Sequence, residues 1–118
     1  MKKHILVCDD DVGILDIISI ILDEKGYAVI ALSDSEQVVA TVIHKKPDVI
    51  LLDLSMPAIS GDEITRRLKS DPATASIPII ISSANKDTEK IAQEAGANNF
   101  ILKPFDIEEL EKMVDQYT

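Results

Sequence analysis

Short apolar stretches alternate with longer amphipathic stretches along this chain, and the alternation predicts a repeated strand-helix unit. Unbroken apolar runs at residues 5–8, 49–52 and 77–81 have the length of strands, and they indicate strands covered on both faces. Residues 27–32 and 100–102 predict two weaker strands. This order is typical of an α/β protein with a parallel sheet, because each helical segment provides a crossover between two strands.

The segments between the strands have helical periodicity and recognisable ends. In the first segment, the apolar positions repeat with helical spacing, and Gly26 indicates its end. The second is expected to begin at Ser33, with Glu36 completing a capping box, and the last begins at Asp106 with Glu109 in the same relation. The five expected helices span residues 14–25, 33–46, 62–69, 86–96 and 106–118.

Length and charge narrow the function classes. The 118 residues fit one domain, and we expect a single domain over residues 1–118 with no output domain visible. The net charge of −9 repels nucleic-acid phosphates and anionic lipid, so we expect neither direct nucleic-acid binding nor membrane binding. The single cysteine, Cys8, cannot form an internal disulfide, and no apolar run approaches membrane-spanning length, which favours a cytoplasmic protein.

Carboxylates follow two of the expected strands. Asp9, Asp10 and Asp11 come directly after the first strand, and Asp53 comes directly after the third. These strands are natural neighbours in a doubly wound sheet, so the carboxylates would converge and repel one another unless a cation neutralises them. Mg²⁺ suits such a sparse set of oxygen ligands. The alternative is that the carboxylates are helix caps facing water, an interpretation that is strongest for Asp11 alone.

The fourth and fifth expected strands end in Ser83-Ala84 and Lys103-Pro104. A hydroxyl and an ammonium group beside a carboxylate site suit the oxygens of a phosphoryl group. Pro104 restricts Lys103 to extended geometry and so fixes where its side chain points. Taken singly, Ser83 could instead be a turn residue and Lys103 a solvated cation.

Together these residues resemble the receiver domain of two-component response regulators, over residues 5–114. The motifs that carry the resemblance occur in order at matching strand ends, and they are Asp9-Asp10, Asp53-Leu-Ser-Met-Pro57 with Gly61 and Glu63, Ser83-Ala84, Ala95-Gly96-Ala97 and Lys103-Pro104-Phe105. The resemblance implies a doubly wound (βα)5, flavodoxin-like three-layer sandwich with parallel strand order 2-1-3-4-5, similar to single-domain chemotaxis regulators.

The resemblance also implies a reaction. Asp53 would accept a phosphoryl group from a phosphohistidine on a histidine kinase or a histidine phosphotransfer protein. The family binds Mg²⁺, with Mn²⁺ as a substitute, through residues matching Asp10 and Asp53 directly, Asp9 through water, and the backbone carbonyl of Ser55. The domain would catalyse only its own phosphotransfer and dephosphorylation.

A switch is implied as well. The Ser83 hydroxyl would move to the new phosphoryl group, beside Ala84 and Lys103, and Phe100 would turn inward and change the surface of the fourth helix, fifth strand and fifth helix. That surface would bind a downstream protein or a C-terminal output domain missing from this chain. The family more often has Thr and Tyr at the two switch positions, and Phe100 could instead be an ordinary core aromatic. The resemblance assigns loop conformation to Pro57, Gly61 and Pro104.

The first helix suggests a docking surface. Ile14 and Ile17 lie partly off its core stripe, and Ile20 occupies a place that favours a polar group. An apolar strip beside the acidic residues could dock the helices of a phosphodonor, whereas tighter packing or self-association would also explain it.

Three other functions use the same fold or a similar site. A phosphorylation-independent, degenerate receiver would be a protein-binding module on the same fold. An aspartate-nucleophile phosphatase usually has a second acid two residues after the nucleophile, where Ser55 stands. A flavin or nucleotide carrier would need a phosphate-binding loop after the first strand, where three aspartates stand.

Overall fold

A computed structural model describes residues 2–118 and contains a five-stranded parallel sheet. Its strand order, β2-β1-β3-β4-β5, is the order implied by the family resemblance. The chain moves outward from β1 to β2 and then returns to β3 on the other side, so the direction of winding reverses between β1 and β3. The strands are β1 (His4–Cys8), β2 (Ala28–Leu32), β3 (Val49–Asp53), β4 (Ile79–Ser83) and β5 (Asn99–Leu102).

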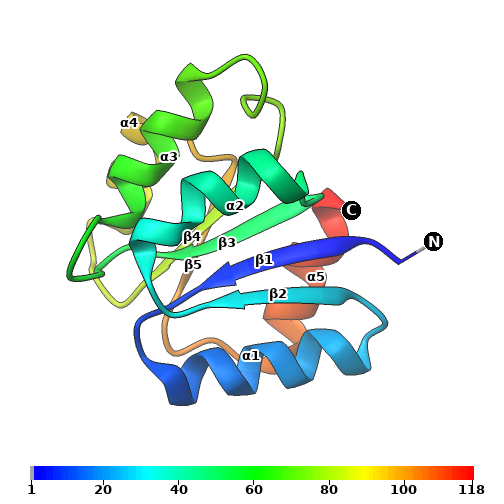
Figure 1. The fold of residues 1–118 in the computed structure, drawn as a ribbon. Helices are drawn as coiled ribbons and strands as arrows, with labels where there is room; N and C mark the ends of the chain where they lie inside the picture. Colours follow the sequence, from blue (N-terminus) through cyan, green and yellow to red (C-terminus); the bar gives the residue numbers. More distant parts are fainter. Residues whose placement is uncertain (1) are drawn as a thin grey trace.

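Helices cover both faces of this sheet (Figure 1). α1 and α5 lie on one face, and α2, α3 and α4 lie on the other. None of the helices formed by residues 2–118 combines the length and the apolar character needed to cross a bilayer. The helices are α1 (Val12–Glu24), α2 (Val38–Lys45), α3 (Gly61–Ser70), α4 (Thr88–Ala95) and α5 (Ile107–Tyr117), and a short 3-10 helix, η1 (Ser35–Gln37), precedes α2.

The sheet separates two hydrophobic clusters, because successive side chains of a strand point to opposite faces. Leu6 and Leu52 pack with α2, α3 and α4, whereas Val7 and Leu51 pack with α1 and α5. Every residue of β3 is buried, as expected for a central strand with helices on both sides. The apolar runs therefore set both the strands and the two-sided core.

Several helix ends follow the sequence prediction. The Asp11 carboxylate accepts hydrogen bonds from two amides of the first turn of α1, so the capping interpretation is confirmed for this residue. Asp106 caps α5 by accepting from the amide of Glu109 at 2.7 Å. Gly26 and Gly96, which follow α1 and α4, have φ of 102° and 90°, values that favour glycine.

The predicted start of the second helix was wrong. Asp34, and not Ser33, caps the turn, because its carboxylate accepts from the amide of Glu36 at 3.0 Å. A turn of 3-10 helix follows, and α2 itself begins at Val38. Adjacent Ser and Asp side chains are both good caps, so the sequence alone did not distinguish them.

The boundaries of α4 and β4 also differ from the prediction. α4 begins at Thr88 and not near residue 86, because residues 85–88 form a turn in which the Asn85 carbonyl accepts a hydrogen bond from the Thr88 amide at 3.1 Å. β4 spans Ile79–Ser83, two residues later at each end than the apolar run. Ile77, at the start of that run, lies before the strand, and its carbonyl accepts a hydrogen bond from Lys69 Nζ at 2.9 Å.

Gly61 brings the first turn of α3 against the end of β3. Its amide donates to the carbonyl of Leu54 at 2.9 Å. A Cβ atom at this position would lie 2.4 Å from the backbone carbonyl oxygen of Asp53, far inside van der Waals contact. The absence of a side chain therefore sets the distance between α3 and Asp53.

We predict that Gly61→Ala lowers the free energy of unfolding by on the order of 3 kcal/mol, because the strand end and the helix must separate. Denaturant unfolding followed by circular dichroism measures this change. Gly13→Ala is the matched control in the first turn of α1, where the added Cβ meets only the Asp11 carboxylate at 3.3 Å. The control should change stability by less than about 1 kcal/mol, and equal losses in both variants would contradict the explanation.

Candidate functional site

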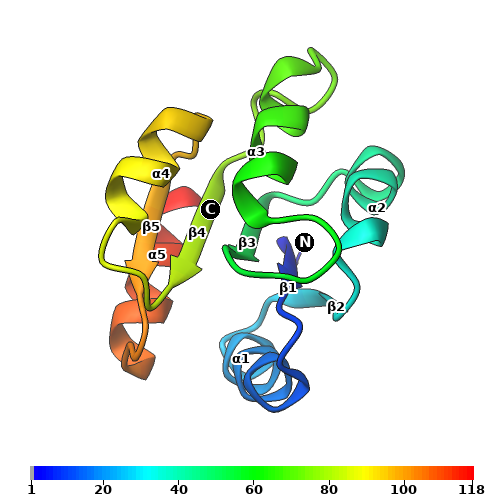
Figure 2. The same ribbon diagram turned by 90° about the vertical axis from the view of Figure 1, so that its left-hand side faces the viewer.

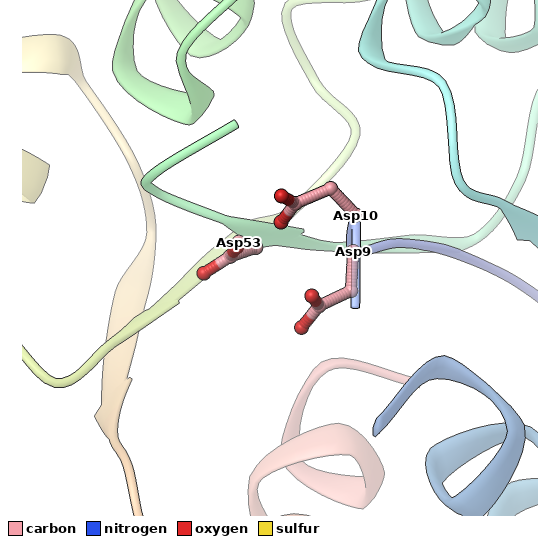
Figure 3. Close-up of side chains that lie close together, drawn as sticks. All are labelled: Asp9, Asp10 and Asp53. Atoms are coloured by element: carbon pink, nitrogen blue, oxygen red, sulfur yellow. The ribbon is translucent and has the colours of Figure 1, made fainter. Parts of the chain in front are cut away.

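Three carboxylates meet where the direction of winding reverses. Asp9 and Asp10 follow β1, and Asp53 ends β3 (Figure 3). An oxygen from each carboxylate lies within 4.8 Å of an oxygen from the other two. Asp9 is 2% exposed and Asp53 is 7% exposed, whereas Asp10 faces solvent. The sequence prediction that these side chains converge is confirmed.

The strand register produces this convergence. Cys8 pairs with Leu52, so Asp9 and Asp53 stand at the next level of adjacent parallel strands. Backbone hydrogen bonds hold the strand ends in place, from the Asp9 amide to Leu32 at 3.2 Å and from the Leu54 amide to Ser82 at 2.9 Å. The view in Figure 2, toward the carboxyl ends of the strands, shows the loops that surround this edge.

Lys103 reaches the carboxylates from the end of β5. Its Nζ lies 2.9 Å from an Asp9 oxygen and 3.2 Å from an Asp53 oxygen. Its backbone amide donates to the carbonyl of Ser83 at 2.9 Å, and the Lys103-Pro104 peptide bond is cis. Burial opposes the charge of Lys103, but hydrogen bonding to Asp9 and the charges of Asp53 and Asp9 outweigh burial and raise its pKa. Lys103 is therefore held as a cation beside both buried carboxylates, and it is not a freely solvated side chain.

One ammonium group does not balance the negative charge of the site. Burial, and then the charge of Asp9, raise the pKa of Asp53 to about 6 although Lys103 opposes this shift. A carboxylate whose charged form is disfavoured in this way would be stabilised by a cation nearby. The donor set also fits Mg²⁺, which prefers oxygen ligands and usually binds one or two carboxylates together with water.

Ser83 and Ala84 lie at the same edge, at the end of β4. Ser83 is 4% exposed and its hydroxyl accepts a hydrogen bond from the Asn85 amide at 2.9 Å, while Ala84 is exposed. Phe100, on β5, is half-buried and packs against the cluster beneath α2, α3 and α4. In this state Phe100 is thus part of the edge of the core, and the Ser83 hydroxyl bonds its own loop.

The loop from β3 to α3, residues 54–60, carries Ser55 and Pro57, and both are exposed. Met56 turns back into the core, where its sulfur lies 3.5 Å from the Cys8 sulfur. Burial, and then the charge of Asp9, raise the pKa of Cys8 to about 12, so this residue is a neutral thiol. Cys8 is a core residue, as its position in an apolar run indicates.

An apolar groove of about 400 Å³ opens beside Lys103, between α1 and α5. Ile14 and Ile17 line it, as the predicted docking strip requires, but Ile20 does not. Ile20 lies instead over β2, in a shallow depression with Val29. The sequence did not predict that the remaining residues line one groove, because they come from separate segments: α1, α5 and the loops before α4 and α5. These residues are Ile18, Ile21, Ala84, Pro104, Phe105, Asp106, Ile107 and Leu110.

The architecture is that of CheY-like regulators. The crystal structure of the chemotaxis response regulator CheY4 of Vibrio cholerae superposes with a TM-score of 0.92 over the whole of both chains, at 24% identity, which shows the shared fold. The sequence model of the response regulator receiver domain matches residues 5–115. The chain therefore belongs to the receiver domain family of two-component response regulators, whose general function is phosphorylation on an aspartate.

Two further comparisons concern the length of a related protein and the metal ion bound by a related domain. The phosphate regulon transcriptional regulatory protein PhoB of Pseudomonas aeruginosa is 40% identical over 110 residues, which are 92% of this chain and 48% of that protein. The chain thus spans about half the length of this relative. The receiver domain of a sensor histidine kinase from the same species is 28% identical, with a TM-score of 0.91 and coverage of 99% of this chain and 98% of that one. Its crystal structure has a magnesium ion coordinated in the active site cleft.

We predict that Asp53→Asn stabilises the metal-free protein at pH 7.5. The folded-state pKa of about 6 lies above the ordinary value of 3.8, so the folded protein binds the proton more tightly than the unfolded chain. Stability is therefore lost as the pH rises from about 4 to 6, and the asparagine variant escapes a penalty on the order of 2 kcal/mol. Denaturant unfolding in the presence of EDTA measures the difference, which should shrink as the pH falls toward about 4.

Asp62→Asn is the matched control for this prediction. Burial opposes the charge of Asp62, but hydrogen bonds from Ser60 and Arg66 outweigh it, and the pKa of Asp62 is lowered. Removing that charge should not stabilise the protein at pH 7.5. If both asparagine variants gained the same stability, the special position of Asp53 would be refuted.

Proposed function

We propose that Asp53 is the phosphoacceptor of this receiver domain and that it takes the phosphoryl group from a phosphohistidine of a histidine kinase or histidine phosphotransfer protein. The observation that carries the proposal is the placement of Lys103, whose ammonium lies 3.2 Å from Asp53 and 2.9 Å from Asp9 at the reversal of the winding. A nucleophilic carboxylate with a fixed cation beside it suits attack on an anionic phosphoryl group.

In the proposed reaction, an oxygen of Asp53 forms a bond to phosphorus while the phosphorus–nitrogen bond of the phosphohistidine breaks. The imidazole of the donor leaves with the electron pair of that bond, and the product on Asp53 is an acyl phosphate. Lys103 offsets the repulsion between the carboxylate and the phosphoryl oxygens. The Ser83 hydroxyl and the Ala84 amide supply hydrogen bonds to those oxygens.

Asp10 and Asp53 would hold Mg²⁺ directly, Asp9 through water, and Ser55 through its backbone carbonyl, with Mn²⁺ as a substitute. The bound ion would neutralise charge on the phosphoryl oxygens. The clustered carboxylate oxygens and the raised pKa of Asp53 support this assignment, as does the magnesium ion in the related kinase receiver domain.

The acyl phosphate is a mixed anhydride, so water can hydrolyse it and end the signal. The domain would catalyse its own phosphorylation and dephosphorylation and act on no separate substrate. The degenerate, phosphorylation-independent alternative does not account for a buried acceptor carboxylate with its cation in contact. The contact between Asp53 and Lys103 therefore favours an active phosphoacceptor over the degenerate receiver.

We further propose that the groove between α1 and α5 docks the phosphodonor. Ile17 and Ile107 are 59% and 56% exposed at its rim, and Lys103 joins the groove to the carboxylates. An apolar helix seated there would bring its phosphohistidine close to Asp53. The same arrangement would account for the exposure of the apolar Ile17 side chain on α1.

The output would follow from Ser83 and Phe100. When the Ser83 hydroxyl turns to the phosphoryl group, it releases the Asn85 amide, and Phe100 can turn inward from the edge of the core. The surface of α4, β5 and α5 would then bind a cytoplasmic target or a C-terminal output domain. Because the chain has a net charge of −9, any contact with DNA would come from a separate domain.

Acetyl phosphate tests the acceptor assignment. We expect wild type to gain the mass of one phosphoryl group when Mg²⁺ is present, and Asp53→Asn to gain none, as measured by intact mass spectrometry. Fast hydrolysis is controlled by beryllofluoride, which should bind wild type with Mg²⁺. A folded wild type that neither gains mass nor binds beryllofluoride would establish the phosphorylation-independent alternative.

The docking groove is tested separately from the chemistry. Ile17→Ser should slow phosphotransfer from a phosphohistidine donor protein by roughly tenfold, as expected for loss of about 1.4 kcal/mol of apolar contact. Its reaction with acetyl phosphate should be unchanged. Ile43→Ser, at a position on α2 that is 47% exposed, is the matched control and should transfer normally. Equal rates for the two variants with the donor protein would argue against the groove.

A further inference from the structure

We infer that Ser35 is a positioning residue for the metal-binding loop and sets the affinity of the site for Mg²⁺. Ser35 lies on η1, is 3% exposed, and takes no part in the carboxylate cluster. Its hydroxyl oxygen accepts a hydrogen bond from the amide of Ile59 at 2.9 Å, although the two residues are 24 positions apart in the sequence. The inference rests on the proposed function, because it concerns the loop that carries the Ser55 carbonyl.

The loop is held at three places. At its base, the Gly61 amide bonds the Leu54 carbonyl at 2.9 Å. Near its start, the Met56 sulfur packs 3.5 Å from Cys8. Toward its end, Ser35 holds the Ile59 amide, and Figure 2 shows the loop from β3 curving toward the beginning of α2 before it enters α3.

The hydrogen bond from the Ile59 amide to the Ser35 hydroxyl connects η1 to the loop between β3 and α3. The Ile59 side chain packs against the core cluster below α2 and α3, so its amide is fixed by the hydroxyl on one side and its side chain by the core on the other. Removing the hydroxyl leaves the amide without that partner and allows residues 55–59 more conformations. Ser55 is exposed, so the position of its carbonyl depends on these anchors.

Mg²⁺ is sensitive to such freedom because it demands near-octahedral geometry at short distances. A carbonyl that must be ordered before it can bind the ion lowers the affinity by the cost of ordering it. Residues that orient ligands without touching the metal commonly affect affinity for this reason. Ser35 would thus contribute to metal binding through Ile59 and the loop, without contacting the ion.

The test measures Mg²⁺ dissociation constants by following amide resonances of the full chain during a MgCl₂ titration. We expect Ser35→Ala to bind Mg²⁺ about 3- to 10-fold more weakly, the range expected from one lost hydrogen bond. Ser35→Thr, which keeps the hydroxyl, should bind within about twofold of wild type by the same reasoning. Hydrogen exchange of the Ile59 amide should be faster in the alanine variant only.

Thr74→Val is the matched control for the loss of a buried hydroxyl. Thr74 is fully buried and donates to the Leu68 carbonyl at 2.7 Å, beyond the far end of α3. This variant should lose stability while its Mg²⁺ affinity stays unchanged. If Thr74→Val weakened Mg²⁺ binding as much as Ser35→Ala, the effect would reflect general stability and the inference would be wrong.

Asp10→Asn separates failure of this inference from failure of the proposed metal site. Wild type that shows no saturable Mg²⁺ shifts, or an Asp10→Asn variant that binds as well as wild type, would overturn the metal assignment on which the inference rests. If Asp10→Asn lost binding while Ser35→Ala kept wild-type affinity, the metal assignment would stand and the role of Ser35 would be refuted. Ser35→Cys, similar in size but a weak acceptor, replaces the alanine variant in the titration if alanine prevents folding.

Discussion

The repulsion between two buried carboxylates, Asp9 and Asp53, is the constraint around which this domain is organised. Parallel strands in register bring the two side chains to the same level at one edge of the sheet. Burial makes their charges costly, and a single ammonium from Lys103 compensates for only part of that cost. The resting site therefore favours added positive charge, which a divalent cation bound at the proposed metal site would supply.

The rest of the fold supplies rigidity to this edge. Both faces of the sheet are covered, so the strand ends cannot tilt without disturbing one of the two hydrophobic clusters. Gly61 allows the first turn of α3 to lie against the backbone carbonyl of Asp53 at the end of β3. The Lys103 amide donates a hydrogen bond to the Ser83 carbonyl at the end of β4, which fixes the backbone of Lys103. These contacts keep the carboxylates of Asp9 and Asp53 beside the Lys103 ammonium, as the proposed role of Asp53 requires.

Much of the fold and of the site was predictable because it depends on local patterns. Runs such as residues 49–52 indicate buried strands. A residue that directly follows a parallel strand lies at the carboxyl end of the sheet, and this rule predicted the positions of Asp53 and Lys103 correctly. Choices between equivalent neighbours were not predictable, as Ser33 and Asp34 illustrate. Contacts between distant segments left no local signal either. Ser35 lies on η1 and Ile59 lies in the loop before α3, and Phe105 lines a groove with α1 only after the chain has folded.

The burial of Cys8 makes the domain a convenient background for site-specific labelling. Cys8 is 1% exposed and its thiol stays protonated, so reagents that need an accessible thiolate should not react with it. A cysteine introduced on the rim of the groove or on α4 would then carry a dye or spin label alone. The chain also has no tryptophan, so a single introduced indole would report on its own surroundings without a competing signal. Because its one cysteine is buried in the core, the surfaces of this protein can be labelled and followed by spectroscopy one site at a time.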